Sequence, residues 1–231
     1  MHRAMALDVK ICGLSEEKSL RAALDAGADL VGFVFHLASP RNVGIAWASR
    51  LRDIVGDEAG AVALVVDASD ADLAEIAERV RPTHFQLHGR ETPERVVEVK
   101  ARFGLPVIKS IAVRTHRDLE DVAGYREVAD TVLFDAKPPV GAMRPGGHGV
   151  TFDWTLLSGL SPGLRFMLSG GLHPGNVAEA MAVARPAAVD VSSGVETAPG
   201  RKDENLIAAF IAEARLADAR LSAPPASMSA A

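Results

Sequence analysis

The sequence predicts a single α/β domain built as a closed (β/α)8 barrel of the TIM type. A short β-branched run, a loop with Gly, Asp or Ser, and a stretch of helical period follow one another eight times. Hydrophobic residues make up 48% of the chain and aromatic residues only 5%, which suits many helices packed closely on buried strands. The length of 231 residues fits one large domain of this class.

The strands are expected to pair in parallel, because each is followed by a helical segment that can act as a crossover. Eight such units in roughly 200 residues are enough to close a barrel. An open, doubly wound sheet is the structural alternative. The predicted strands are residues 8–13, 29–35, 61–67, 84–89, 106–113, 131–136, 165–171 and 188–194.

Helices are expected between these strands, and some carry recognisable ends. In "SEEKSLRAALDAG", Ser15 can cap the helix and Gly27 can terminate it. In "DADLAEIAERVRP", Pro82 ends the helical pattern. Further helical segments are "TPERVVEVKARFG", "NVAEAMAVARP" and "NLIAAFIAEARLA".

The barrel is expected to span residues 1–215. Residues 216–231 include the small, polar and proline-bearing "SAPPASMSAA", which predicts a disordered tail without function. The longest expected loop is 137–151, after the sixth strand, and loops of this length are usually lids or binding loops unless they are disordered. Its closure as a lid stays an open question at this point.

Composition argues against several classes of partner. Lys and Arg number 25 against 30 Asp and Glu, and no basic stripe with aromatic residues stands out, so nucleic acid is not expected. The single cysteine excludes a disulfide framework, and "MHRAMALDVK" lacks the apolar core of a signal peptide. No apolar window approaches the length of a membrane span. A cytoplasmic protein is expected, as a monomer or a homodimer.

The active site of such a barrel lies at the carboxyl ends of its strands, which directs attention to Cys12 at the end of the first strand. Taken alone, a free cysteine is more often a buried, inert hydrophobe than a reactive thiol. Other polar side chains at predicted strand ends are His36, Asp67, His88 and Asp135, with Arg41 just beyond His36.

The last two units carry glycine-rich turns that suit phosphate. "LSGGLHPGNV" (168–177) and "VSSGVE" (191–196) each place small residues between a strand and a helix. Glycine lets the backbone approach a ligand, and the amides that open a helix carry partial positive charge. Phosphate is commonly held by these two loops in barrels of this kind.

Six segments together resemble phosphoribosylanthranilate isomerase, the single-barrel enzyme of tryptophan biosynthesis. The resemblance runs in order over roughly residues 8–215, and the set is far more specific than any one piece. The segments are "VKICGL", "GADLVGFVF…SPRNV", "FQLHG.E", "FDAK…GGHG..FDW", "LSGGL.P.NV" and "AVDVSSGVE..PG.KD".

The resemblance implies an Amadori rearrangement of a small phosphosugar, N-(5-phosphoribosyl)anthranilate, to 1-(2-carboxyphenylamino)-1-deoxyribulose 5-phosphate, without metal or cofactor. This reaction needs a general acid to protonate the furanose oxygen and a general base to remove the proton from C2. By resemblance, Cys12 aligns with the base and Asp135 with the acid. A thiol with a pKa of about 8.5 is only roughly 3% thiolate at pH 7, so Cys12 needs positive potential.

The resemblance also implies binding roles. Arg41 matches the arginine that faces the anthranilate carboxylate, Asp190 matches an aspartate near the sugar hydroxyls, and His88 matches a pocket residue of unassigned role. The loop of residues 137–151 is longer than the family pattern, and His148 stands where a small hydroxyl or amide residue is common. The family's phosphate contacts fall on Gly147, Gly149, Gly170, Gly171, Ser193 and Gly194.

Other functions make distinguishable predictions. Indole-glycerol-phosphate synthase would be expected to use lysine and glutamate at its strand ends, and a histidine-pathway isomerase would use two aspartates, one ending the first strand; Cys12 favours the anthranilate substrate. A catalytically inactive phosphosugar-binding barrel could lack Cys12 or Asp135, but both are present. No metal site is expected, because His84 and His88 lie about 13 Å apart along one strand. Substrate breadth stays open.

Overall fold

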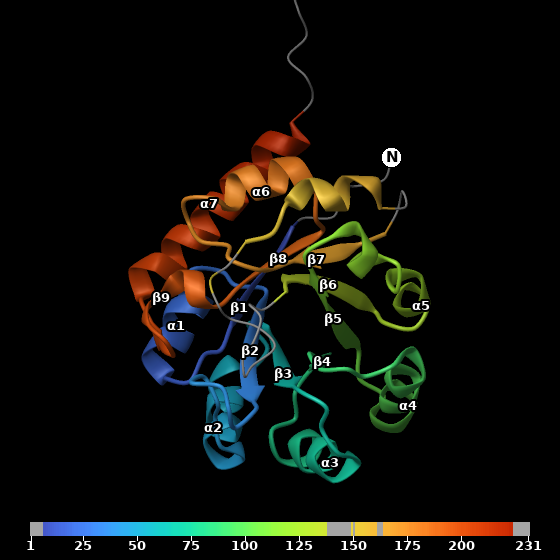
Figure 1. Cartoon of the computed structure of the whole chain (residues 1–231). Coiled ribbons are helices and arrows are strands. Elements are labelled where there is room, and N and C mark those ends of the chain that lie inside the picture. The colour runs from blue at the N-terminus through green and yellow to red at the C-terminus, as the bar shows by residue number, and fades with distance from the viewer. Residues whose placement is uncertain (1–6, 138–148, 150, 161–163, 224–231) are drawn as a thin grey trace, which may run out of the picture.

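The computed structural model describes residues 7–137, 149, 151–160 and 164–223. The predicted closed barrel is confirmed, because eight strands pair in sequence order and β8 returns to β1. Figure 1 shows the helices arranged around these strands. The strands are β1 (Asp8–Cys12), β2 (Leu30–Phe35), β3 (Gly60–Val65), β4 (His84–Leu87), β5 (Val107–Val113), β6 (Thr131–Ala136), β7 (Phe166–Leu168) and β8 (Ala188–Val191).

Helices follow the strands, but they are not uniform. After β6 the described residues form only the 3-10 helix η2 (Trp154–Gly159), and α5 is a single short turn preceded by η1 (His116–Leu119). A small antiparallel hairpin, β9 (Glu196–Ala198) and β10 (Arg201–Lys202), follows the 3-10 helix η3 (Ser193–Val195). The α-helices are α1 (Glu17–Asp25), α2 (Ile45–Val55), α3 (Asp70–Arg79), α4 (Pro93–Phe103), α5 (Val122–Arg126), α6 (Val177–Ala184) and α7 (Glu204–Ser222).

The ends of α1 and α3 differ in part from those that the sequence predicts. The cap expected at Ser15 is wrong: Glu16 occupies the N-cap position of α1 and makes no side-chain capping bond. Gly27 does end this helix, with a φ of +85° that favours glycine. Ser69 caps α3 in a reciprocal capping box with Asp72, an arrangement that the repeat pattern did not single out.

The last helix extends past residue 215, the expected end of the barrel domain. Helix α7 continues to Ser222, and Ala217 within it is buried. Arg215 ties this helix to the first two strands, because its guanidinium donates to Asp29 (2.6 Å) and to the carbonyl oxygen of Leu7. The expected tail of 216–231 therefore starts inside a helix, and residues 224–231 lie outside the described residues.

The barrel encloses its own small core, separate from the large core between strands and helices. Because side chains alternate along a strand, Val9 and Ile11 of β1 pack toward the helices while Lys10 and Cys12 point inward. An apolar layer fills the interior, and above it the interior becomes polar toward the carboxyl ends of the strands. This layer consists of Val62, Ile108, Leu133, Met167 and Ala188.

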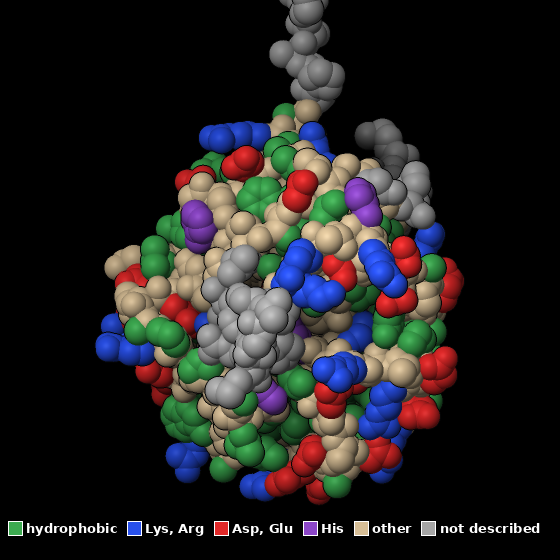
Figure 2. Space-filling model, in the orientation of Figure 1, with side chains coloured by type: hydrophobic (Ala, Val, Ile, Leu, Met, Phe, Trp, Pro, Cys, Tyr) green, Lys and Arg blue, Asp and Glu red, His purple; other side chains and the backbone are tan. Residues whose placement is uncertain are grey.

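The outer surface is charged with both signs. On the face shown in Figure 2, basic and acidic side chains intermingle around α3 and α4, where Arg95 and Arg102 both pair with Asp70. Exposed ion pairs of this kind contribute little to stability, at most about 1 kcal/mol each. Among the helices in the described part of the chain, none combines the length and the apolar character that crossing a membrane requires.

Candidate active site

A pocket opens at the carboxyl ends of the strands, the end at which ligands bind in barrels of this kind. Most of the residues expected at the site line this one pocket. Gly194 is the next residue in the chain after Ser193, which lines the pocket. Gly147 and His148 lie outside the described residues. The expected residues that line it are Cys12, Arg41, His88, Asp135, Gly149, Gly170, Gly171, Asp190 and Ser193.

Cys12 ends β1 and is 4% exposed, so its sulfur faces a nearly closed part of the pocket. Its neighbour across the sheet is Gly32 of β2, and a Cβ added there would lie 2.9 Å from the sulfur. Glycine at this position therefore leaves the thiol its space. Burial raises the pKa of Cys12 above its ordinary value, and the nearby Lys10 ammonium partly counteracts that effect by charge and hydrogen bonding.

Lys10 lies one layer below Cys12 on the same inward face of β1 and is completely buried. Its Nζ donates to Oδ1 of Asp190 at 2.8 Å, and the Ser169 hydroxyl donates to Oδ2 of the same carboxylate at 3.1 Å. Burial lowers the pKa of Lys10, but Asp190 and Cys12 together raise it further, so Lys10 is an ammonium. Sequence reasoning assigned Lys10 no role, although its inward direction follows from its spacing to Cys12.

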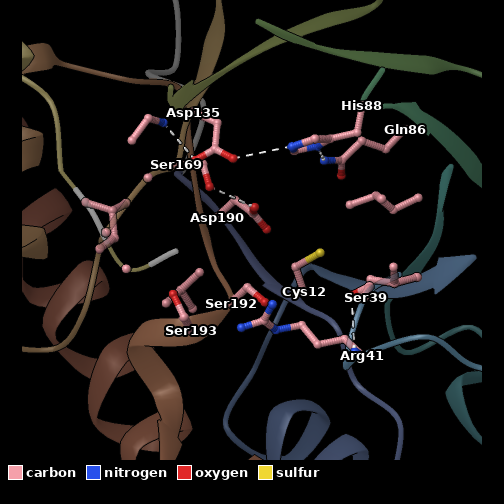
Figure 3. A pocket seen from close by; sticks show the side chains of 18 of the residues that line it. Cys12, Ser39, Arg41, Gln86, His88, Asp135, Ser169, Asp190, Ser192 and Ser193 are labelled. Carbon is pink, nitrogen blue, oxygen red and sulfur yellow. Dashed lines mark hydrogen bonds and ion pairs between the residues drawn. The ribbon is translucent and has the colours of Figure 1, made fainter. Parts of the chain in front are cut away.

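Asp135 reaches the pocket from β6, and both of its oxygens have partners. Its Oδ1 accepts from the backbone N–H of Ala136 at 2.8 Å, and its Oδ2 lies 3.3 Å from Nε2 of His88. Nδ1 of His88 in turn lies 3.0 Å from Nε2 of Gln86. Figure 3 shows this line of three side chains along the wall of the pocket opposite Arg41. Lys137, two residues after Asp135 in the chain, pairs with Asp118 at 2.6 Å.

Gln86 is fully buried on β4, and its side-chain oxygen has no hydrogen-bond partner among the described residues. A buried amide oxygen without a donor costs about 1–3 kcal/mol. Since Gln86 lines the pocket, a hydrogen-bond donor on a bound ligand would remove that cost. His36 Nε2, at another wall of the pocket, is unpartnered in the same sense.

Arg41, which was expected to face a ligand carboxylate, binds the buried carboxylate of Glu196 in the structure. Its Nε and Nη2 donate to the two oxygens of Glu196 at 2.7 and 2.8 Å, a two-point interaction that fixes the guanidinium plane. Lys202 donates to Glu196 at 2.8 Å and to the carbonyl oxygen of Ser192 at 2.9 Å. Arg41 also packs on Gly13, where a Cβ would meet its Cδ at 2.5 Å.

Glu196 and Lys202 are therefore site residues that sequence reasoning did not assign, although both stand in the matched segment "GVE..PG.KD". Burial raises the pKa of Glu196, but Arg41 and Lys202 lower it more, so this carboxyl is ionised. Burial lowers the pKa of Lys202 to about 8. Lys10 and Lys202 are the two cations that lower the pKa of the Cys12 thiol, against the effects of burial and of Asp190.

The loops after β7 and β8 meet at the mouth of the pocket. Gly170 and Gly171 have φ angles of +88° and +66°, and a Cβ on Gly170 would lie 2.5 Å from the backbone nitrogen of Ala136. A Cβ on Gly194 would lie only 1.8 Å from the carbonyl oxygen of Leu172. These turns need glycine for their conformation and for close backbone approach, as a cup of backbone amides requires.

His84 begins β4 and His88 directly follows it, so the two histidines lie at opposite ends of the barrel. His88 lines the pocket, whereas His84 lines a second cavity at the opposite end of the strands, together with Asp8 and Asp29. Within the described ranges, no group of three or more His, Cys, Asp or Glu side chains is arranged to hold a metal ion.

Comparison with known proteins gives one consistent family. The family described as N-(5'phosphoribosyl)anthranilate (PRA) isomerase matches residues 9–213. The chain is 55% identical over 214 residues to N-(5'-phosphoribosyl)anthranilate isomerase of Rhodopseudomonas palustris (strain HaA2), covering 93% of this chain and 98% of that protein.

Solved structures agree with this result. Phosphoribosyl anthranilate isomerase from Thermotoga maritima has a TM-score of 0.82 at 38% identity and covers 90% of this chain and 98% of that one. A complex of phosphoribosyl anthranilate isomerase with reduced 1-(o-carboxyphenylamino)-1-deoxyribulose 5-phosphate has a TM-score of 0.80 at 35% identity, with the same coverage. The chain belongs to the N-(5'-phosphoribosyl)anthranilate isomerase family.

Proposed function

We propose that this chain converts N-(5'-phosphoribosyl)anthranilate to 1-(2-carboxyphenylamino)-1-deoxyribulose 5-phosphate in tryptophan biosynthesis, with Cys12 as general base and Asp135 as general acid. The observation that carries the proposal is the shared pocket: a thiol from β1 and a carboxyl from β6 line it from different walls (Figure 3). The related isomerase solved with the reduced product supports a ligand of this chemistry.

The acid acts first. Asp135 gives a proton to the furanose oxygen, the bond between that oxygen and C1 breaks, and the electron pair on the anthranilate nitrogen forms an imine. A donor within hydrogen-bond reach of the leaving oxygen is required for this step. His88 Nε2 lies 3.3 Å from Asp135 Oδ2 and can pass a proton to this carboxyl after it has acted as the acid.

The base acts second. The Cys12 thiolate takes the proton from C2, leaving an enaminol whose C1 is then protonated as the C2 hydroxyl becomes a carbonyl. The proton taken from C2 is returned to C1, and the proton released by the C2 hydroxyl replaces the one that Asp135 gave to the ring oxygen. The net result moves one hydrogen from C2 to C1 and one from the C2 hydroxyl to the former ring oxygen, and it consumes no other reactant. Burial raises the pKa of the Cys12 thiol, and Lys10 and Lys202 lower it in part, so the two lysines support the thiolate. Asp135 stands on another wall beside His88, and Lys137 pairs with Asp118 instead.

Substrate binding divides among the remaining walls. Arg41, held in plane by Glu196, faces the pocket from the loop after β2 and is suited to a planar carboxylate. Asp190 lines the pocket between Asp135 and Cys12 (Figure 3), and we assign it as an acceptor for sugar hydroxyls. The loops with Gly149, Gly170 and Ser193 supply backbone amides for the phosphate.

The test generates phosphoribosylanthranilate in situ and follows the loss of its fluorescence in the presence of the purified protein. Wild-type protein is expected to consume it, and Cys12→Ala and Asp135→Asn are expected to lose at least about 100-fold in kcat, the usual contribution of a positioned acid or base. Arg79→Ala, on the exposed face of α3, is the control.

Full activity in Cys12→Ala or Asp135→Asn would refute the corresponding role. A wild-type protein that binds the reduced product but does not consume the substrate would identify the alternative, a phosphosugar-binding barrel without catalysis. A wild-type protein that turns over only a histidine-pathway aminoaldose would assign the site to that substrate instead.

A further inference from the structure

Lys10 is the one fully buried lysine that lies directly beneath the proposed base, among the described residues. Lys10 and Cys12 are two positions apart on β1, so their side chains leave the same face of the strand and enter adjacent layers of the barrel interior. A charge in such a layer is costly to bury and is seldom found without a partner. Packing alone would be served by an aliphatic side chain.

The geometry brings the Lys10 ammonium up to the Cys12 sulfur. The backbone opposite Cys12 is Gly32, and a Cβ built there would lie 2.9 Å from the Cys12 sulfur and 3.2 Å from Lys10 Nζ. The Cys12 sulfur and Lys10 Nζ therefore border the same space, which a side chain at position 32 would fill. Asp190 holds the ammonium there from β8 at 2.8 Å, and Ser169 holds Asp190 from β7.

Other charges also act on the thiol. Asp190 raises the pKa of Cys12, and Lys202 lowers it from the hairpin side, but among the groups that lower it Lys10 has the largest effect. Val34 of β2 and Leu64 of β3 pack in one apolar cluster with Cys12. Around the rest of the pocket stand Arg41 and Glu196, which bind each other, with His36, His88 and Asp135.

We propose that Lys10 is a positioning residue for Cys12: its ammonium, anchored by Asp190, stabilises the thiolate at the floor of the pocket. The catalytic consequence rests on the proposed function, but the effect on the thiol does not. Cys12 is the only cysteine in the chain, so its ionisation and its alkylation can be measured directly in the folded protein.

The experiment titrates the thiolate by its ultraviolet absorbance and measures the rate of alkylation by iodoacetamide across the same pH range. The comparison is between the wild-type protein and the double variant Lys10→Met with Asp190→Asn, which removes the ammonium and leaves no unpaired carboxylate behind. Because Asp190 raises the pKa of Cys12, its removal alone would lower the thiol titration, so an upward shift reports the loss of the ammonium. We expect the double variant to titrate at least about 1 pH unit higher and to be alkylated about tenfold more slowly at pH 7.5.

A second variant separates charge from hydrogen bonding. Lys10→Gln keeps a donor for Asp190 and removes the charge, and we expect the same upward shift of the thiol titration. The matched control is Lys109→Met with Glu91→Gln, which removes another buried lysine and its carboxylate, on β5 and the loop after β4. In that control the titration of Cys12 should stay at its wild-type position.

A double variant that titrates at or below the wild-type position and is alkylated at the wild-type rate, with both proteins folded by circular dichroism, would overturn the proposal. An unshifted Lys10→Gln would overturn it as well. Failure of the proposed function has a different signature: Cys12→Ala would then retain full activity, while the thiol titrations would still show whether Lys10 stabilises the thiolate.

Discussion

Lys109 and Glu91 form a buried ion pair that holds the loop after β4, and its loss gives the sharpest test of what stabilises the rim of the barrel. Lys109 Nζ donates to Glu91 at 2.7 Å and to the carbonyl oxygens of Gly89 at 2.8 Å and Leu87 at 3.3 Å. The Glu91 carboxylate also accepts from the backbone N–H groups of Asp67 and Gly89. The two side chains are only 3% and 4% exposed.

Lys109→Met is therefore expected to lower the free energy of unfolding by about 3–5 kcal/mol, because it leaves a buried carboxylate without its counterion. Adding Glu91→Gln should recover part of the loss, since the amide oxygen can still accept from the backbone and no charge remains. The matched control is Lys100→Met, which removes a surface pair with Asp130 whose side chains are 34% and 42% exposed. That change should cost no more than about 1 kcal/mol.

Urea unfolding followed by circular dichroism measures these differences, with the fluorescence of the two tryptophans as a second probe. A loss below 1 kcal/mol in Lys109→Met, equal to that of Lys100→Met, would refute the reasoning. It would mean that solvent reaches the Glu91 carboxylate and that burial in the static structure overstates its cost.

Two other changes have defined outcomes. Burial raises the pKa of Asp118, but hydrogen bonds from Lys137 and from backbone N–H groups lower it to about 2, below the ordinary value of 3.8. The ionised carboxyl therefore stabilises the fold above pH 3.8, and this stabilisation is lost as the pH falls toward 2. Asp118→Asn should therefore cost about 2 kcal/mol at pH 6 and almost nothing at pH 2, as measured by urea unfolding at each pH; an equal cost at both would contradict the assignment. Gly194→Ala should destabilise the protein by at least about 1–3 kcal/mol and raise the KM for substrate, because its Cβ would overlap the backbone oxygen of Leu172. Gly44→Ala, with open space around its Cβ, should leave KM unchanged, and a KM for Gly194→Ala equal to it would argue against the phosphate cup.

The barrel could be predicted because its determinants are local. A period of two in the strands and 3.6 in the helices is written into consecutive residues, and eight repetitions of the pattern leave few architectures. The helix ends were less predictable: Ser15 has the chemistry of a cap, but Glu16 occupies the cap position, and the Ser15 carbonyl accepts from the indole of Trp47 instead. That contact joins two helices, so no local rule contains it.

The residues of the candidate site could be predicted from their positions at strand ends and from the family resemblance. The ion pairs between those residues could not. Arg41 and Glu196 are 155 positions apart, and their interaction depends on the hairpin β9–β10 folding back onto the loop after β2. A close approach of Gly200 to the Pro40 backbone, where a Cβ would lie 2.5 Å from the carbonyl oxygen, fixes that contact. Periodicity can say that each residue lies at the rim, but only the closed fold decides which rim residues meet.

Three lysines of the barrel have buried side chains, and their contacts distinguish support of a loop from an effect on the Cys12 thiol. Lys10, Lys109 and Lys202 each bind a carboxylate at 2.7–2.8 Å, so the pairing itself does not distinguish them. Lys109 is directed to backbone carbonyls of the loop that it supports, which accounts fully for its burial. Lys202 likewise donates to the carbonyl oxygen of Ser192 and so supports the loop after β8. Lys10 instead lies beside Cys12, and among the groups that lower the pKa of that thiol it has the largest effect. Since a buried ion pair adds little net stability over aliphatic packing, Lys10 is best explained by what it does to the ionisation of Cys12.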